Sequence, residues 1–132
     1  RQQRTSDPVV QKGLNILADF LIKVERELTA KKEQYTKEGY GYAHSSLVDA
    51  IAVLKHGARR YREAIPYFRL LVKYNRLQGL YGQGICYAKL GEYYKALALL
   101  QSCLAVCPEN SPDHKRISSL IEEIKALMRR DK

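Results

Sequence analysis

The hydrophobic positions of this chain recur with the spacing of amphipathic helices. Apolar residues return every three or four positions in four segments, residues 8–33, 45–76, 77–110 and 111–130. This spacing puts the apolar side chains on one face of each helix, which must then pack against another helix. With 132 residues the chain is long enough to bury a real core. The pattern therefore predicts one all-α domain, 1–132, of about six helices.

A long N-terminal helix is expected over 8–33, after a polar start at 1–7 that we expect to be disordered. Asp7 can cap this helix, and Pro8 is well tolerated in its first turn. Its apolar stripe consists of Val10, Leu14, Leu17, Leu21, Val24 and Leu28, widened by Ile16 and Phe20. We expect the stripe to pack within the chain and the protein to be a monomer. The alternatives are that the helix fills a binding groove or pairs with a second copy.

The segment 45–76 predicts a pair of helices joined by a turn. A loop before the pair is expected to carry Gly39 and Gly41, and Ser45 or Ser46 is expected to cap the first helix. Gly57 is a suitable residue to end that helix.

The second helix of this pair contains Pro66, which removes a backbone hydrogen bond from a helix interior. This helix is therefore expected either to start late, near Glu63, or to bend at the proline. Three of its positions match positions 32 residues later, namely Tyr61, Ala64 and Phe68 with Tyr93, Ala96 and Leu100. The segment thus predicts a degenerate copy of the unit that follows it.

The segment 77–110 is the most regular part of the chain and predicts two helices that meet at a tight turn. Gly91 is the expected turn residue, because glycine adopts a positive φ without steric cost. The regularly spaced positions are Leu80, Gln83, Gly84, Tyr87, Ala96, Leu100 and Pro108. A polar break follows, and a last amphipathic helix is expected within 111–130 as an end cap.

The spacing of these residues resembles the tetratricopeptide repeat, whose units of about 34 residues carry Gly, Tyr, Ala and Pro at the same positions. Leu80, Gln83 and Leu100 stand where that pattern has Trp, Leu and Phe. The resemblance implies a short right-handed superhelix of helix pairs. It also implies a non-enzymatic protein-interaction module or adaptor, with no cofactor.

Such repeats bind peptides along a concave groove lined by the first helix of each pair. The resemblance implies groove positions at Leu47, Ile51, Leu54, Lys55, Gln78, Tyr81, Ile85, Ala88 and Lys89. This lining is apolar and aromatic with a few cations, which suits a protein or peptide partner with apolar or acidic anchor residues. Each of these positions can instead face a neighbouring helix.

The order of a long first helix, a degenerate repeat, a regular repeat and a capping helix resembles the mitochondrial fission 1 family. The most similar stretches are Gly84–Leu97 and Ser118–Lys132. This resemblance implies a cytoplasmic domain that recruits partner proteins to the mitochondrial or peroxisomal outer membrane, if an anchor follows Lys132. No apolar run in the sequence is long enough to span a membrane.

The net charge of +9 brings a second function into consideration. Arg59, Arg60 and Arg62 surround Tyr61, and cations beside an aromatic ring are typical of proteins that bind single-stranded nucleic acid. A basic repeat protein in an RNA-containing complex is therefore the alternative function. A solvated basic surface is the simpler interpretation of the same residues.

The remaining chemistry-bearing residues predict neither an enzyme nor a metal site. Cys86, Cys103 and Cys107 are expected to be reduced, buried thiols, and Cys103 with Cys107 and His114 would need a fourth ligand to hold zinc. No phosphate-binding loop or nucleophile motif is present. The histidines stand in no arrangement typical of a catalytic base.

Overall fold

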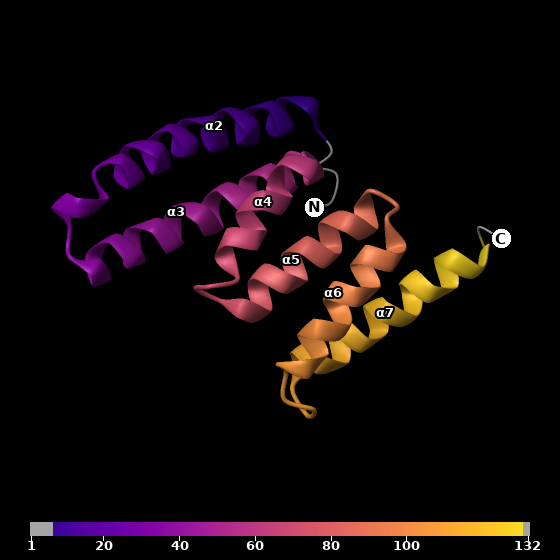
Figure 1. Ribbon diagram of the computed structural model, residues 1–132. Coiled ribbons are helices and arrows are strands. Elements are labelled where there is room, and N and C mark those ends of the chain that lie inside the picture. Colours follow the sequence, from indigo (N-terminus) through magenta and orange to yellow (C-terminus); the bar gives the residue numbers. More distant parts are fainter. Residues whose placement is uncertain (1–6, 131–132) are drawn as a thin grey trace.

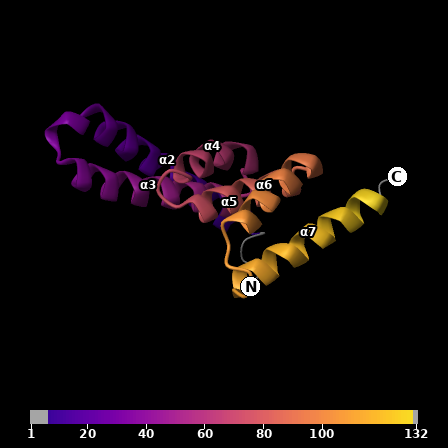
Figure 2. The same ribbon diagram turned by 60° about the horizontal axis from the view of Figure 1, so that its bottom comes forward.

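The computed structural model describes residues 7–130, which form six α-helices and one 3₁₀ turn. The helices are α2 (Pro8–Ala30), α3 (Lys37–Gly57), α4 (Tyr61–Leu71), α5 (Arg76–Lys89), α6 (Tyr93–Ala105) and α7 (Pro112–Arg130), with the 3₁₀ turn η1 (Lys32–Gln34) after α2. Each helix packs chiefly against its neighbours in sequence, so the chain advances as a row of helices (Figure 1). Figure 2 shows the α2–α3 pair at one end of this row and α7 at the other. The predicted all-α helical-repeat fold is confirmed.

The ends of α2 and α3 are set by polar caps. Asp7 accepts a hydrogen bond from the Val9 amide at 2.8 Å, as predicted for this helix start. Thr36 accepts one from the Gly39 amide at 3.0 Å, and α3 begins directly after it. The predicted loop through Gly39 and Gly41 is therefore wrong. The threonine cap overrides the low helix propensity of the two glycines.

The two turns within the helix pairs share one backbone feature. Gly91 has φ +79°, as predicted for the turn between α5 and α6. In the turn between α3 and α4 the positive φ of 62° falls on Arg59, two residues after the predicted helix end at Gly57. Since α4 starts at Tyr61, Pro66 lies inside the helix, and the first alternative, a late start near Glu63, is wrong. The second alternative, a bend at the proline, stays a prediction.

Two clusters of buried side chains form the core. One joins α3, α4 and α5 and consists of Val48, Ala52, Ala64, Ile65, Phe68, Leu71 and Cys86. The other joins α6 and α7 and consists of Ala96, Leu100, Cys103, Cys107, Ile117, Ile121 and Ile124. Glycines in α5 allow the close approach between helices. A Cβ atom at Gly82 would collide with the Phe68 ring, and one at Gly84 would lie 2.9 Å from Leu100.

The first helix, α2, packs on α3 through only part of its apolar stripe. Ala18 is fully buried, but Val10, Leu17, Ile16 and Phe20 are 38–61 % exposed. The stripe was expected to be covered within the chain, and this holds for one side of it only. None of the side chains that line the hollows described below comes from α2.

An ion-paired lysine joins α2 to the repeats. Lys55 of α3 is 3 % exposed, and its Nζ atom donates hydrogen bonds to Asn15 Oδ1 at 2.7 Å, Asp19 Oδ1 at 3.0 Å and Glu63 Oε1 at 2.8 Å. All three ammonium protons therefore have acceptors, two of them on α2. A buried charge is tolerable because it is paired in this way.

A histidine makes a second polar link to α2. His44 Nε2 lies 2.9 Å from Glu25 Oε2, and His44 Nδ1 lies 2.7 Å from the Tyr74 hydroxyl. The Tyr40 ring stacks on His44 at a centroid distance of 5.1 Å. Because a carboxylate only accepts hydrogen bonds, Nε2 is the donor to Glu25. His44 thus connects α2 with the segment between α4 and α5.

Candidate binding groove

A largely apolar hollow of about 280 Å³ lies between α3 and α5. Its lining comes from three helices and consists of Val53 and His56 of α3, Phe68 of α4, and Gln78, Tyr81, Gly82 and Ile85 of α5. Val53 is 51 % exposed, so its side chain is available to a partner. The hollow can take an apolar side chain between Val53 and Ile85.

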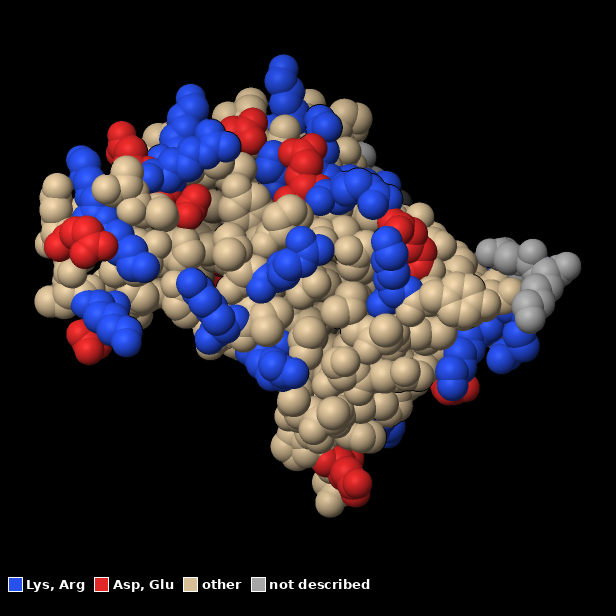
Figure 3. All heavy atoms as spheres, in the orientation of Figure 1, with Lys and Arg blue, Asp and Glu red and all other residues tan. Residues whose placement is uncertain are grey.

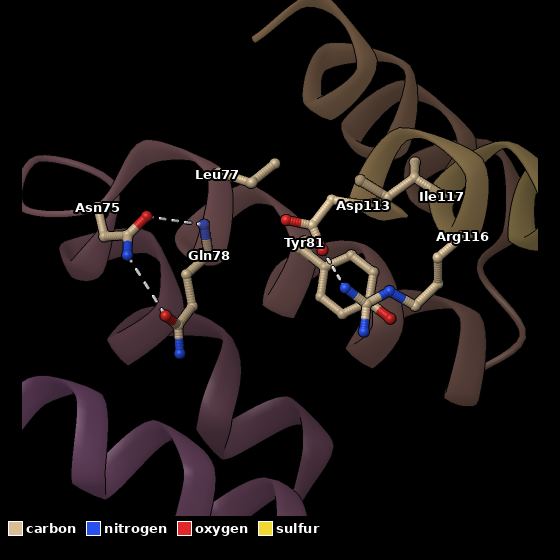
Figure 4. Close-up of a pocket in the computed structure, with 7 residues that line it drawn as sticks. All are labelled: Asn75, Leu77, Gln78, Tyr81, Asp113, Arg116 and Ile117. Carbon is tan, nitrogen blue, oxygen red and sulfur yellow. Dashed lines mark hydrogen bonds and ion pairs between the residues drawn. The ribbon is translucent and has the colours of Figure 1, made fainter. Parts of the chain in front are cut away.

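A second hollow of about 390 Å³ lies between α5 and α7. It is lined by Asn75, Leu77, Gln78, Tyr81, Asp113, Arg116 and Ile117. Figure 4 shows Asn75 and Gln78 on one side of this hollow and the ion pair of Asp113 with Arg116 on the other. Gln78 and Tyr81 line both hollows, so the two adjoin at these side chains, and we refer to them together as the groove across α3, α5 and α7.

The polar groups of the groove are mostly held by neighbouring side chains. Gln78 donates from Nε2 to Asp49 Oδ1 at 3.1 Å, and its backbone amide donates to Asn75 at 3.2 Å. Burial lowers the pKa of His56, and the positive charge of Lys89 lowers it further. His56 is therefore neutral at pH 7. The wall that it forms with Val53 carries no charge, which suits an apolar ligand.

The predicted groove positions on α5 fall largely on this surface. Gln78, Tyr81 and Ile85 line the hollows, and Lys89 is exposed and close enough for its charge to act on His56. Ala88 instead is half-buried and packs against the core cluster of α6 and α7.

The predicted groove positions on α3 do not line the hollows. Ile51 has no exposed surface, Lys55 is buried in its contacts with α2, and Leu47 and Leu54 are half-buried. The face of α3 toward α5 carries Asp49, Val53 and His56 instead. The reason is that α2 covers the side of α3 on which Lys55 lies.

Sequence reasoning missed Val53 and His56, and it missed that α7 contributes to the groove. A usable signal was present, because Asp49, Val53 and His56 follow one another at helical spacing beside the apolar stripe of α3. The α7 residues Asp113 and Arg116 gave no such signal, since charged residues in the first turn of a helix are usually explained by their interaction with the helix dipole.

The cysteines lie in the core. All three are free and buried, and Cys103 lies between α6 and α7 within the second cluster. Within residues 7–130 no group of three or more His, Cys, Asp or Glu side chains is placed to hold a metal ion. Over the same residues, no helix combines the length and apolarity needed to cross a membrane.

Comparison with known proteins identifies the α5–α6 unit. The tetratricopeptide repeat family model matches residues 77–110, which contain α5, the Gly91 turn and α6. No curated protein and no solved structure matches the chain. The narrower resemblance to the mitochondrial fission 1 family stays a prediction. In residues 77–110 the chain carries a repeat of the tetratricopeptide family, as its sequence predicted.

Proposed function

We propose that the chain is a non-enzymatic module that binds a protein partner in the groove across α3, α5 and α7. The observation that carries this proposal is the pair of adjoining hollows that share Tyr81 on a tetratricopeptide repeat. Repeats of this kind form extended surfaces that bind other proteins. Val53, Tyr81 and Ile85 supply the apolar surface that an anchor side chain needs.

The groove favours a particular partner chemistry. The apolar hollow takes one large aliphatic or aromatic side chain, and Lys89 at the end of α5 attracts a carboxylate beside it. Gln78 Nε2 has a second proton beyond the one donated to Asp49, and it can donate this proton to a peptide backbone. The partner is therefore an extended or helical peptide with an apolar anchor next to acidic residues.

Selection of random peptides against the chain tests the proposal. Enriched peptides should carry an apolar anchor, and their affinity should fall at least about tenfold in Val53→Glu and in Tyr81→Ala. The matched control is Tyr94→Ala, which removes another tyrosine, 78 % exposed, on α6. It should bind the selected peptides like the original chain.

Circular dichroism of each variant separates loss of binding from loss of fold. Intact helicity with lost binding supports the groove. If the selected peptides bind Val53→Glu and Tyr81→Ala unchanged, the groove is not the site. If Tyr81→Ala unfolds, Val53→Glu alone tests the groove, because Val53 is half exposed and its replacement should leave the fold intact.

The cellular setting follows from the fission 1 resemblance. We place the module in the cytoplasm, recruiting partner proteins to the cytosolic face of a mitochondrial or peroxisomal membrane. Support comes from the similarity of Gly84–Leu97 and Ser118–Lys132 to that family. Imaging of the full-length gene product with organelle markers tests this. A diffuse signal would contradict the membrane setting and leave the groove proposal intact.

The nucleic-acid alternative loses much of its support from the basic cluster. Of the three arginines around Tyr61, Arg60 lies 3.7 Å from Glu63 and Arg62 lies 2.7 Å from Glu92. Cations that are already paired contribute less to phosphate binding. We therefore prefer a protein partner.

A further inference from the structure

The outer face of α2 carries an apolar strip that nothing in the described part of the chain covers. Val9 is 78 % exposed, Ile16 59 %, Phe20 61 % and Leu17 48 %. The spacing of Val9, Ile16 and Phe20 places them on one face, opposite the buried Ala18. The first helix of a stacked-repeat protein needs a polar outer face for solubility. This face is apolar, as expected of a binding surface.

The strip is not explained by packing within the chain. The links of α2 to α3 run through Ala18, through Asn15 and Asp19 to Lys55, and through Glu25 to His44. None of the four exposed apolar residues takes part in these contacts. Their exposure therefore costs solubility and contributes little to the stability of the fold.

The shape of the strip suits a helix. Gly13 lies between Val9 and Ile16 on the same face, and no atom lies within 4 Å of where its Cβ would be. The strip thus has a notch at Gly13, flanked by the larger side chains of Val9 and Ile16. A glycine at such a position lets another helix approach closely. A ridge of apolar side chains on a partner helix would fit this notch.

The exposed Glu27 follows Phe20 on the same face of α2, but two lysines lie along the edge of the strip. Lys12 and Lys23 are exposed and flank it, whereas the nearby carboxylate of Asp19 is already paired with Lys55. Figure 3 shows Lys and Arg side chains, with Asp and Glu side chains among them, along the edge of the molecule where α2 lies. We propose that the outer face of α2 binds a partner helix that carries acidic residues beside an apolar ridge.

The two lysines beside the strip also disfavour a second copy of the chain as the occupant. Each copy has a net charge of +9, and pairing through α2 would bring Lys12 and Lys23 of both copies to one interface. Like charges at an interface oppose association. A helix with acidic residues beside its apolar ridge is attracted to these lysines, whereas a second copy of the chain is repelled by them.

A designed helix of about 18 residues tests this surface directly, with leucines along one face and glutamates beside them. Its control has the same leucines and lysines in place of the glutamates. In fluorescence anisotropy at about 0.15 M salt, the acidic peptide should bind at least about tenfold more tightly than the basic one. The double variant Ile16→Gln, Phe20→Gln should lose at least about tenfold in affinity for the acidic peptide. Tyr94→Gln, a change of equal kind on α6, should lose none.

Several outcomes would overturn the proposal. Equal binding of the acidic and basic peptides would mean that the strip recognises apolar surface alone. Acidic-peptide binding that survives in the double variant would place the site elsewhere. Binding to phosphatidylserine vesicles without binding to the acidic peptide would assign the strip to a membrane surface. Sedimentation showing a dimer that the double variant abolishes would assign it to a second copy. Peptides selected for the groove should still bind the double variant, which separates this surface from the proposed function.

Discussion

The Nζ atom of Lys55 lies 3.0 Å from Oδ1 of Asp19, and this pair links α3 to α2 through a cation with 4 % of its side chain exposed. Replacing Lys55 by Met should destabilise the protein by about 1–3 kcal/mol, because three acceptors lose their donor. The lower part of this range is favoured, since Asp19 and Glu63 are more than half exposed and water can solvate them. Urea unfolding measures the change. Lys12→Met, at an exposed lysine of α2, is the control and should change stability by less than about 0.5 kcal/mol.

The contribution of Lys55 should depend on pH in a defined direction. Burial alone would lower its pKa, but the hydrogen bonds and charges of Glu63 and Asp19 raise it above the usual 10.5. A pKa raised by folding stabilises the protein below the unfolded-state pKa and stops doing so as pH rises through the folded-state value. The stability difference between the original chain and Lys55→Met should therefore be constant up to about pH 9 and shrink above 10.5. A difference that grows in alkali would contradict this assignment.

The hydroxyl of Tyr74 should matter because it lies 2.7 Å from His44 Nδ1. Tyr74→Phe keeps the ring and leaves that nitrogen without its partner, so unfolding should become easier by about 1–2 kcal/mol. Tyr94→Phe removes a hydroxyl from a side chain that is 78 % exposed, and its stability should stay within about 0.5 kcal/mol. Thermal unfolding followed by circular dichroism compares the two. Equal effects would mean that the His44 contact contributes nothing.

Replacing a glycine by alanine should lower the stability of the protein in α5 and raise it in α3. Gly82→Ala puts a methyl group into the Phe68 ring, and such overpacking costs about 1–3 kcal/mol. Gly41→Ala, in α3, meets no atom within 4 Å and should stabilise by up to about 1 kcal/mol through helix propensity. Denaturant unfolding of both variants measures this. A stabilised Gly82→Ala would show that α4 can retreat from α5 without cost.

The thiols should differ in their reaction with alkylating reagents. Burial raises the pKa of Cys86 to about 12, and burial together with Cys107 raises that of Cys103 to about 11. The thiolate is the reactive form, so both should react near pH 8 only when the protein opens. Cys107 is 8 % exposed, whereas the other two have no exposed surface, so it should react first. Mass spectrometry of peptides after timed labelling resolves the order. Equal rates for all three in the folded protein would contradict it.

The α5–α6 pair was predictable because its signals are local. Gly91 occupies a turn that demands positive φ, and Ala96 and Leu100 are core positions at helical spacing. The start of α3 was also encoded locally, by Thr36, but the two glycines after it pointed to a loop. The predicted end of that helix at Gly57 is confirmed, but the positive φ of the turn falls on Arg59, which no glycine marked in the sequence.

The groove face of α3 was harder to predict, because helical spacing alone does not say which side of the helix is covered. Both sides of that helix are apolar enough to be buried, and the position of α2 decides which side is covered. That position depends on Lys55 meeting Asn15 and Asp19, residues 36 or more positions away in sequence. A sequence does not reveal this pairing, so Lys55 is expected to be an exposed cation of the groove and Val53 is expected to be a core residue. The placement of both is a tertiary effect.

The two polar links also fix where α2 stands along α3. Apolar helix faces can slide by one turn, about 5.4 Å, and still bury similar area. If α2 slid by one turn in one direction, Lys23 would take the place of Asp19 beside Lys55. The same slide would move Glu25 away from His44. Slippage in that direction replaces an attraction with a repulsion. The buried lysine and the histidine therefore oppose a shift of α2 along the repeats in this direction.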